Sequence, residues 1–299
     1  MTMQSSVVSV ETWRGIAARR LSGAWGSVVV LPQRGAKIVS LTDAHGHEWL
    51  AQPDQDLPPV DLSVDFCDAE LCGWDEIAPT MSSADEADHG DVWRTDWTTL
   101  RDDSEILELE TRDVRDRFIL QRELRVTTSG LELRYRARAT TDALPFQWMA
   151  HPQFRAPQGT SLTLLPTPCV LVEHPESSTP TAVEWPQVAE PIDEVPPGTG
   201  RKLWARPGCA PRAAKITHPG AGSLTLSWNE TVTDFAMWVD NRWRSREPVI
   251  AVEPTTSFGD DVLGAVAGGR ALILTPDDWA TWDMKLDLST PDEPEGVVE

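Results

Sequence analysis

Several features are scarce in this 299-residue sequence, and each scarcity excludes a class of protein. No stretch approaches the ~18 uninterrupted apolar residues of a membrane-spanning helix, and residues 1–15 lack the basic start and apolar core of a secretory leader. We therefore expect an unexported, cytoplasmic protein without a membrane partner. Cysteine is also scarce, with neither the C-x-x-C spacing of zinc sites nor the density of a disulfide scaffold. We expect reduced thiols at Cys67, Cys72, Cys169 and Cys209.

Basic side chains are strongly outnumbered. Lys and Arg total 26 against 47 Asp and Glu, which gives a formal net charge of -21. A field of this sign repels phosphate backbones and anionic lipids, so a nucleic-acid partner is excluded. A neutral small molecule meets no such barrier, whereas an anionic one would need a local cluster of Arg or Lys.

Tyrosine and phenylalanine are rare, and tryptophan takes their place. The chain has a single Tyr and 6 Phe against 14 Trp. An indole ring offers a flat apolar face and one N–H donor, a combination suited to the C–H faces of a sugar ring. Most of these rings belong in a core, but the composition favours a carbohydrate partner.

Alternation of apolar and polar residues with period two dominates the chain. From Leu131 to Ala139 the odd-numbered side chains are apolar and the even-numbered ones charged, as in a half-buried antiparallel strand. Similar runs lie at residues 27–31, 36–41, 105–111, 118–126, 161–165, 223–228, 235–239, 249–252, 271–274 and 282–288. Only residues 260–268 are typical of a helix, with acidic residues first and glycines last. These patterns predict an all-β fold, a large antiparallel β-sandwich with very few short helices.

The longest irregular stretch is residues 174–200, where repeated prolines disfavour regular pairing. It is either a linker between domains or a long loop beside a binding cleft. Strands are predicted on both sides of it, which favours the loop. We therefore expect one domain over residues 1–299, with flexible ends at about 1–10 and 291–299.

Three clusters place a titratable side chain where a strand meets a turn. In the first, Gly90 lets the backbone approach a ligand beside His89, while Trp93 and Arg94 supply a stacking face and a cationic donor. A solvated loop histidine would have the same pattern, so this cluster alone decides nothing.

The other two clusters lie at apolar strands. His151 follows the run Phe146–Ala150, where a histidine can titrate near neutrality as an acid or base, although a core histidine bound to a carbonyl fits equally well. Glu253 ends the run Val249–Val252, where an ionised carboxylate is costly unless it is paired or functional. This makes Glu253 the strongest single candidate.

The order and spacing of these clusters resemble the aldose 1-epimerase (galactose mutarotase-like) superfamily. The resemblance extends over nearly the whole chain and rests on His89-Gly90, on His151-Pro-x-Phe and on Glu253-Pro. The segment Gly73–Thr80 is similar to one found in epimerase-like branches of the superfamily. The resemblance implies a supersandwich fold and an isomerase that interconverts sugar anomers without a metal or organic cofactor.

The resemblance also implies roles for individual residues. Glu253 would be the general base that removes the anomeric hydroxyl proton, His151 the acid that protonates the ring oxygen, and His89 a residue that orients the ring. The Asn-Arg pair that precedes the first histidine in galactose mutarotases is absent here, so Glu76 or Arg94 is expected in that part of the cleft.

Other residues of the expected site are assigned more loosely. Asp240 is the nearest counterpart of the superfamily's additional substrate-binding Asp, and Trp93 and Trp148 are further candidates for sugar contact. Two other functions stay open: a carbohydrate-binding protein without catalysis, and a phosphosugar mutarotase in which Arg94 or the group Arg242, Arg244 and Arg246 faces the ligand. The oligomeric state stays open between monomer and homodimer.

Overall fold

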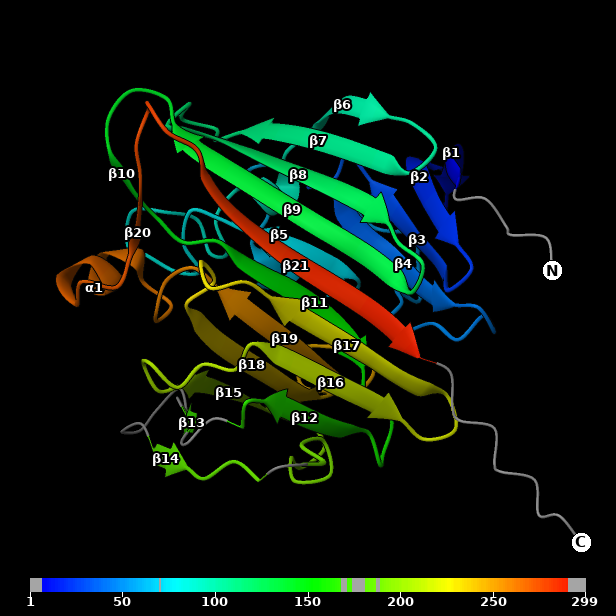
Figure 1. Cartoon of the computed structure of the whole chain (residues 1–299). Coiled ribbons are helices and arrows are strands. Elements are labelled where there is room, and N and C mark those ends of the chain that lie inside the picture. The colour runs from blue at the N-terminus through cyan, green and yellow to red at the C-terminus, as the bar shows by residue number, and fades with distance from the viewer. Residues whose placement is uncertain (1–6, 70, 168–170, 174–180, 187–188, 290–299) are drawn as a thin grey trace, which may run out of the picture.

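The computed structural model describes residues 7–69, 71–167, 171–173, 181–186 and 189–289. Two large antiparallel sheets pack face to face, with the 8-stranded sheet in front of the 11-stranded one in Figure 1. This confirms the all-β class. Within the described ranges, no helix is long and apolar enough to cross a membrane.

The 11-stranded sheet carries the features that matter for function. Its strand order is β1-β2-β3-β4-β5-β11-β19-β18-β15-β13-β14. The strands are β1 (Val7–Trp13), β2 (Ile16–Gly23), β3 (Gly26–Leu31), β4 (Lys37–Asp43), β5 (Trp74–Ile77), β11 (Met149–Arg155), β13 (Leu171–Glu173), β14 (Thr181–Val183), β15 (Thr199–Ala205), β18 (Asp234–Asn241) and β19 (Val249–Thr255). Segments far apart in sequence, β5, β11 and β19, are therefore neighbours at its centre.

The 8-stranded sheet has the order β12-β16-β17-β21-β9-β8-β7-β6. Its strands are β6 (Thr98–Asp102), β7 (Ile106–Arg112), β8 (Phe118–Val126), β9 (Gly130–Ala139), β12 (Ser161–Leu165), β16 (Ala213–His218), β17 (Gly222–Trp228) and β21 (Ala280–Ser289). A small sheet pairs β10 (Leu144–Phe146) with β20 (Leu272–Leu274). The helical elements are η1 (Phe66–Asp68), η2 (Val92–Arg94) and α1 (Val262–Ala267).

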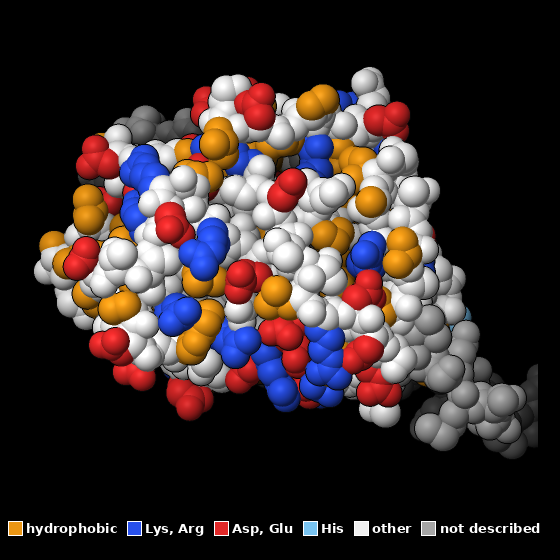
Figure 2. Space-filling model, turned by 90° about the horizontal axis from the view of Figure 1, so that it is seen from above, with side chains coloured by type: hydrophobic (Ala, Val, Ile, Leu, Met, Phe, Trp, Pro, Cys, Tyr) orange, Lys and Arg blue, Asp and Glu red, His pale blue; other side chains and the backbone are white. Residues whose placement is uncertain are grey.

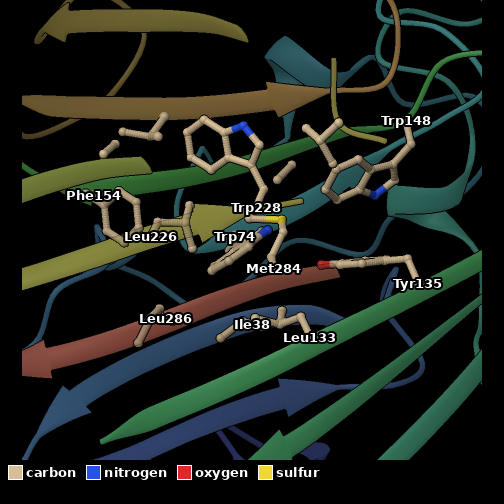
Figure 3. Close-up of a cluster of buried hydrophobic side chains, with 14 of the residues drawn as sticks. Ile38, Trp74, Leu133, Tyr135, Trp148, Phe154, Leu226, Trp228, Met284 and Leu286 are labelled. Carbon is tan, nitrogen blue, oxygen red and sulfur yellow. The ribbon is translucent and has the colours of Figure 1, made fainter. Parts of the chain in front are cut away.

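The core lies between the two sheets. Alternate residues of each strand point inward, so the period-two pattern of the sequence becomes one apolar layer. Figure 3 shows Trp74, Trp148 and Phe154 of the larger sheet facing Leu133, Tyr135 and Met284 of the smaller one. Most of the tryptophans serve this core, and four of them have less than 2% of their surface exposed: Trp49, Trp74, Trp148 and Trp282.

The local predictions hold with small shifts. The predicted helix is α1, and the Asp261 side chain caps it by accepting from the amides of Leu263 and Gly264. Residues 7–10, expected in a flexible end, instead begin β1 and pair with β2. Residues 1–6 and 290–299 lie outside the described residues.

Two expectations need correction. Cys209 is disulfide-bonded rather than reduced, whereas Cys67 and Cys72 form no disulfide within the described residues and Cys169 lies outside them. The Pro-rich stretch 174–200 contains the short strand β14, which pairs with β13, because the prolines flank residues 181–183 and leave their amides free to bond. Residues 174–180 and 187–188 of that stretch also lie outside the described residues.

The face of the molecule seen in Figure 2 has no extended basic surface among the residues drawn there in colour. Basic side chains lie beside acidic ones, and ion pairs such as Arg136–Glu108 and Arg134–Glu132 link the outward side chains of the smaller sheet. Exposed pairs of this kind contribute little to stability. They pair these arginines with carboxylates, which weakens the attraction of the smaller sheet for a polyanion.

Two histidines join the sheets at one edge. His218, at the end of β16, bonds through Nε2 to the carbonyl of Arg155 at 2.6 Å and through Nδ1 to Nε2 of His47 at 2.8 Å. A carbonyl only accepts, so His218 Nε2 carries the proton and His218 Nδ1 accepts from His47. The His218 ring also stacks on Trp49, with centroids 4.4 Å apart. Burial favours the neutral form of His218, in which Nδ1 accepts this hydrogen bond.

The histidine pair predicts a loss of stability in acid. Burial lowers the pKa of His218 from 6.5 to about 4 and also lowers that of His47. Between these pH values the unfolded chain binds the proton and the folded chain does not, so the free energy of unfolding falls as pH drops from about 6.5 to 4. We expect a contribution of about 2 kcal/mol, and His218→Gln should reduce the slope of stability against pH in urea titrations.

The exposed His45 provides the control for this prediction. His45→Gln should leave the slope of the unfolding free energy against pH as in the wild type. Equal slopes in wild type and His218→Gln would contradict the assignment.

Candidate active site

The candidate site lies on the outer face of the 11-stranded sheet, the face turned away from the core. In the pairing of β11 with β19, Met149 lies opposite Thr255 and Gln153 opposite Ala251, so His151 and Glu253 stand midway between these pairs. Phe154 and Val252 belong to the core, so the alternating side chains of His151 and Glu253 point outward together. Two residues about a hundred positions apart are thus brought side by side by strand register.

A cavity of about 410 Å³ opens over this part of the sheet. Its lining comes from β11, β15, β18 and β19 below and from the loops that follow β4, β5, β18 and β19 above. The lining residues are Phe66, Cys67, Leu71, Met81, Ser82, Asp88, His89, His151, Gln153, Lys202, Trp238, Asp240, Trp243, Arg244, Glu253 and Asp260. The volume lies in the range of small-molecule sites.

His151 and Glu253 face each other without a hydrogen bond. Nε2 of His151 lies 3.7 Å from Oε1 of Glu253, and the Glu253 side chain is fully buried. Oε1 accepts no hydrogen bond from any described residue, whereas Oε2 is bound by the ammonium of Lys202. A buried carboxylate oxygen without a donor is costly, so this atom is positioned to receive one from a ligand.

The environment shifts the pKa of both groups. Burial lowers the pKa of His151 well below 6.5, and the nearby His89 and Lys202 lower it further. Burial raises the pKa of Glu253, while the charge and hydrogen bond of Lys202 oppose that rise. The two values are therefore drawn toward each other, which suits a pair that exchanges protons with one substrate.

His89 reaches the same cavity from the loop after β5. Its ring stacks on Phe66, with centroids 3.9 Å apart and an interplanar angle of 10°, and lies 5.7 Å from the ring of His151. Nδ1 of His89 contacts Oδ2 of Asp88 at 2.8 Å. Gly90 follows with φ of 65°, and a Cβ there would lie 1.9 Å from the carbonyl oxygen of Ala78. Only glycine fits this close approach.

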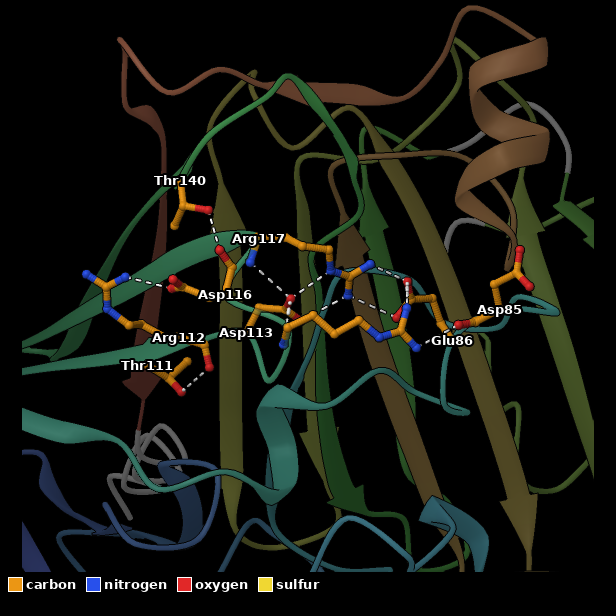
Figure 4. Close-up of polar contacts among 9 residues, drawn as sticks. Asp85, Glu86, Thr111, Arg112, Asp113, Asp116, Arg117 and Thr140 are labelled. Atoms are coloured by element: carbon orange, nitrogen blue, oxygen red, sulfur yellow. Dashed lines mark hydrogen bonds and ion pairs between the residues drawn. The ribbon is translucent and has the colours of Figure 1, made fainter.

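An ionic network ties the loop that carries His89 to the β7–β8 turn (Figure 4). The guanidinium of Arg117 binds both Glu86 of the loop and Asp113 of the turn, and Arg115 binds Glu86 and the carbonyl of Asp85. The hydrogen bonds and charges of Asp113 and Glu86 raise the pKa of Arg117, although burial opposes that rise. Because Asp113 is fully buried and Glu86 nearly so, the network holds the loop over the cavity more firmly than exposed ion pairs would.

Of the five residues expected to contact substrate, Asp240 lines the cavity. Its carboxylate is already engaged, because it accepts from the amides of Trp243, Arg244 and Ser245 and thereby shapes the loop after β18. Trp238 of β18 and Trp243 of this loop lie at the wall of the cavity, with their ring centroids 5.6 Å apart. Asp240 thus positions an aromatic surface.

The other four do not line the cavity. Glu76 is fully buried in the core, where it bonds to Arg122 at 2.7 Å, to the hydroxyl of Tyr135 at 2.9 Å and to the indole of Trp148 at 2.6 Å. Trp93 packs edge-on against Phe66, the ring on which His89 stacks. Arg94 pairs with Asp91 and bonds to the carbonyl of Val64. These side chains stabilise the fold around the site.

Sequence reasoning missed three polar residues of the cavity. Lys202 binds Glu253, and Gln153 and Asp260 each direct a buried atom, Nε2 and Oδ1, that has no hydrogen-bond partner among the described residues. Gln153 was within reach of prediction, since it lies two residues after His151 and shares its face. Lys202 sits in the irregular pattern Arg201-Lys202-Leu203-Trp204, where neither face is identifiable from sequence.

No metal site accompanies these groups in the described part of the chain. No cluster of three or more His, Cys, Asp or Glu side chains there could hold a metal ion. The described residues that line the cavity offer four carboxylates, two imidazoles, an ammonium, a guanidinium and an amide.

The sequence matches no protein-family model and no curated protein. Solved structures are similar to it. A galactose mutarotase-like protein from Clostridium acetobutylicum matches with a TM-score of 0.72 at 14% identity, covering 96% of this chain and 99% of the other. A galactose mutarotase related enzyme from Lactobacillus acidophilus matches with 0.70 at 12% identity, covering 92% and 99%.

A third structure, the Slr1438 protein from Synechocystis, matches with a TM-score of 0.68 at 13% identity, covering 97% of this chain and 98% of the other. At such identities the likeness concerns the backbone and its topology. The architecture of two large antiparallel sheets is the galactose mutarotase-like fold.

Proposed function

We propose that the chain is an aldose 1-epimerase-like enzyme, which interconverts the α and β anomers of a hexose or related sugar. One observation carries the proposal: a buried imidazole and a buried carboxylate oxygen lie 3.7 Å apart, unbonded to each other, at the base of a cavity of about 410 Å³. In a pyranose, the anomeric hydroxyl and the ring oxygen are attached to one carbon. An acid and a base that act on them must therefore stand close together, as these two do.

The reaction needs one proton on the pair. Oε1 of ionised Glu253 takes the proton of the anomeric hydroxyl, while the imidazolium of His151 gives a proton to the ring oxygen as the C1–O5 bond breaks. The open-chain aldehyde then rotates about C1–C2. The hydroxyl attacks the other face of the aldehyde, Glu253 returns its proton, and His151 regains the one it gave.

The surrounding residues would hold the sugar. His89 lies against His151 and is placed to orient the ring, and Nε2 of Gln153, which bonds to no other described residue, is a donor for a sugar hydroxyl. Trp238 and Trp243 offer an apolar wall for the C–H face of the ring.

The charge balance of the cavity favours a neutral sugar over a phosphorylated one. Four carboxylates line it, those of Asp88, Asp240, Glu253 and Asp260, against the cations Lys202 and Arg244. Lys202 is already paired with Glu253, and of the arginines 242, 244 and 246 only Arg244 lines the cavity.

The proposal predicts accelerated anomer exchange. NMR exchange spectroscopy on freshly dissolved neutral hexoses and pentoses, with sugar phosphates alongside, should show a rate that rises linearly with enzyme concentration for at least one neutral sugar. Binding of a sugar without acceleration would instead indicate a non-catalytic carbohydrate-binding protein. Acceleration confined to sugar phosphates would overturn the charge argument.

A further inference from the structure

Lys202 is the least expected member of the site. It projects from β15, two strands away from Glu253 across the sheet, and its ammonium bonds to Oε2 of that carboxylate. Only 13% of the Lys202 side chain is exposed, and Nζ also lies 5.6 Å from the centre of the Trp204 ring. The flexible stem of this lysine is thus held in place over an aromatic ring.

The two oxygens of Glu253 therefore have different roles. Oε2 is bound by Lys202, and Oε1, 3.7 Å from His151, has no hydrogen-bond partner among the residues that the structure describes. We propose that Lys202 is a positioning residue for the anomer exchange: by binding one oxygen of Glu253 it keeps the buried carboxylate ionised and aims the other oxygen at the substrate. This inference rests on the proposed function for its kinetic consequence but not for its electrostatic one.

Several charged or titratable groups approach Glu253 and His151 from neighbouring elements. Glu253 is approached by Lys202 from β15, His151 from β11, His89 from the loop after β5 and Asp260 from the loop before α1. Farther along the same face, Lys37 acts on His151 and is itself paired with Asp75 at 2.5 Å. Of these groups, Lys202 is the one that bonds directly to Glu253.

Removal of the Lys202 charge should move the acidic limb and the basic limb of the pH–rate profile in the same direction. Lys202 lowers the pKa of Glu253 against the effect of burial, and it also lowers the pKa of His151. In Lys202→Met we therefore expect both limbs of the profile to move to higher pH, the limb set by Glu253 by about 1–3 units, because an adjacent opposite charge shifts a carboxyl pKa by that much. A lysine with only a structural role would lower the rate equally at all pH values.

Two variants complete the kinetic test. Lys202→Arg keeps a cation beside Glu253 and should return the profile most of the way to that of the wild type. Lys215→Met removes an exposed lysine from β16 of the other sheet and should leave the profile unchanged. An unshifted profile in Lys202→Met, with a uniformly lower rate, would overturn the inference.

A second measurement separates this inference from the proposed function. In the ligand-free protein, ¹³C-NMR titration of labelled glutamate side chains identifies Glu253 as the signal lost in Glu253→Gln. Its titration midpoint should rise in Lys202→Met and not in Lys215→Met. If no sugar is turned over but the midpoint rises, the proposed function fails and the positioning role stands. An unchanged midpoint refutes the role whatever the activity.

Discussion

Glu253→Gln should lower the rate of anomer exchange by ~10²–10⁴-fold, the range found when a positioned general base is removed. Gln keeps the shape of Glu and can still bond to the substrate, but it cannot take the anomeric proton. The effect should fall on kcat more than on KM, because the lost interaction is strongest when the proton moves. Initial rates from NMR exchange at several sugar concentrations measure both constants.

The matched control for this variant is Glu230→Gln, which makes the same change at an exposed position in the turn after β17. It should exchange anomers at the wild-type rate. His151→Asn should lose about as much activity as Glu253→Gln, and the double variant little more than either, because the two groups act in one proton exchange. Losses that multiply in the double variant would contradict a coupled pair.

The strands were predictable because their alternation depends only on which side chains face the core. The runs at 118–126 and 161–165 match β8 and β12 residue for residue. His151 and Glu253 could be placed by the same reasoning, since each lies in an apolar strand, on the face opposite to the residues of that strand that point into the core. What sequence does not give is the order of strands, which alone makes β11 and β19 neighbours.

The candidate substrate contacts show where such reasoning ends. The sequence predicts Glu76 in the part of the cleft left by the absent Asn-Arg pair and Trp148 as a sugar contact, yet their side chains point into the core and bond to each other. A buried Glu that meets an Arg from the opposite sheet leaves no local signal in the sequence. Lys202 is the converse case, since its importance comes from a carboxylate two strands away.

The buried ion pair of Glu76 and Arg122 leads to the largest expected loss of stability. Both side chains are fully buried, and they link β5 of one sheet to β8 of the other. Arg122 also bonds to the carbonyl of Ala36 and lies over the ring of Trp97. Arg122→Met would fill much of the same volume but leave the Glu76 carboxylate without a counter-ion. We expect the free energy of unfolding to fall by about 3–5 kcal/mol in urea titrations at neutral pH.

The control and a compensating variant make this loss specific to the buried charge. Arg112→Met breaks an exposed pair with Asp116 and should cost no more than about 1 kcal/mol. Adding Glu76→Gln to Arg122→Met removes the unpaired charge, so the double variant should be more stable than Arg122→Met alone.

Burial already raises the pKa of Glu76 against the effect of Arg122. In Arg122→Met that carboxyl should protonate more readily on folding, so the loss should shrink as pH falls, whereas a loss caused by packing alone would stay constant.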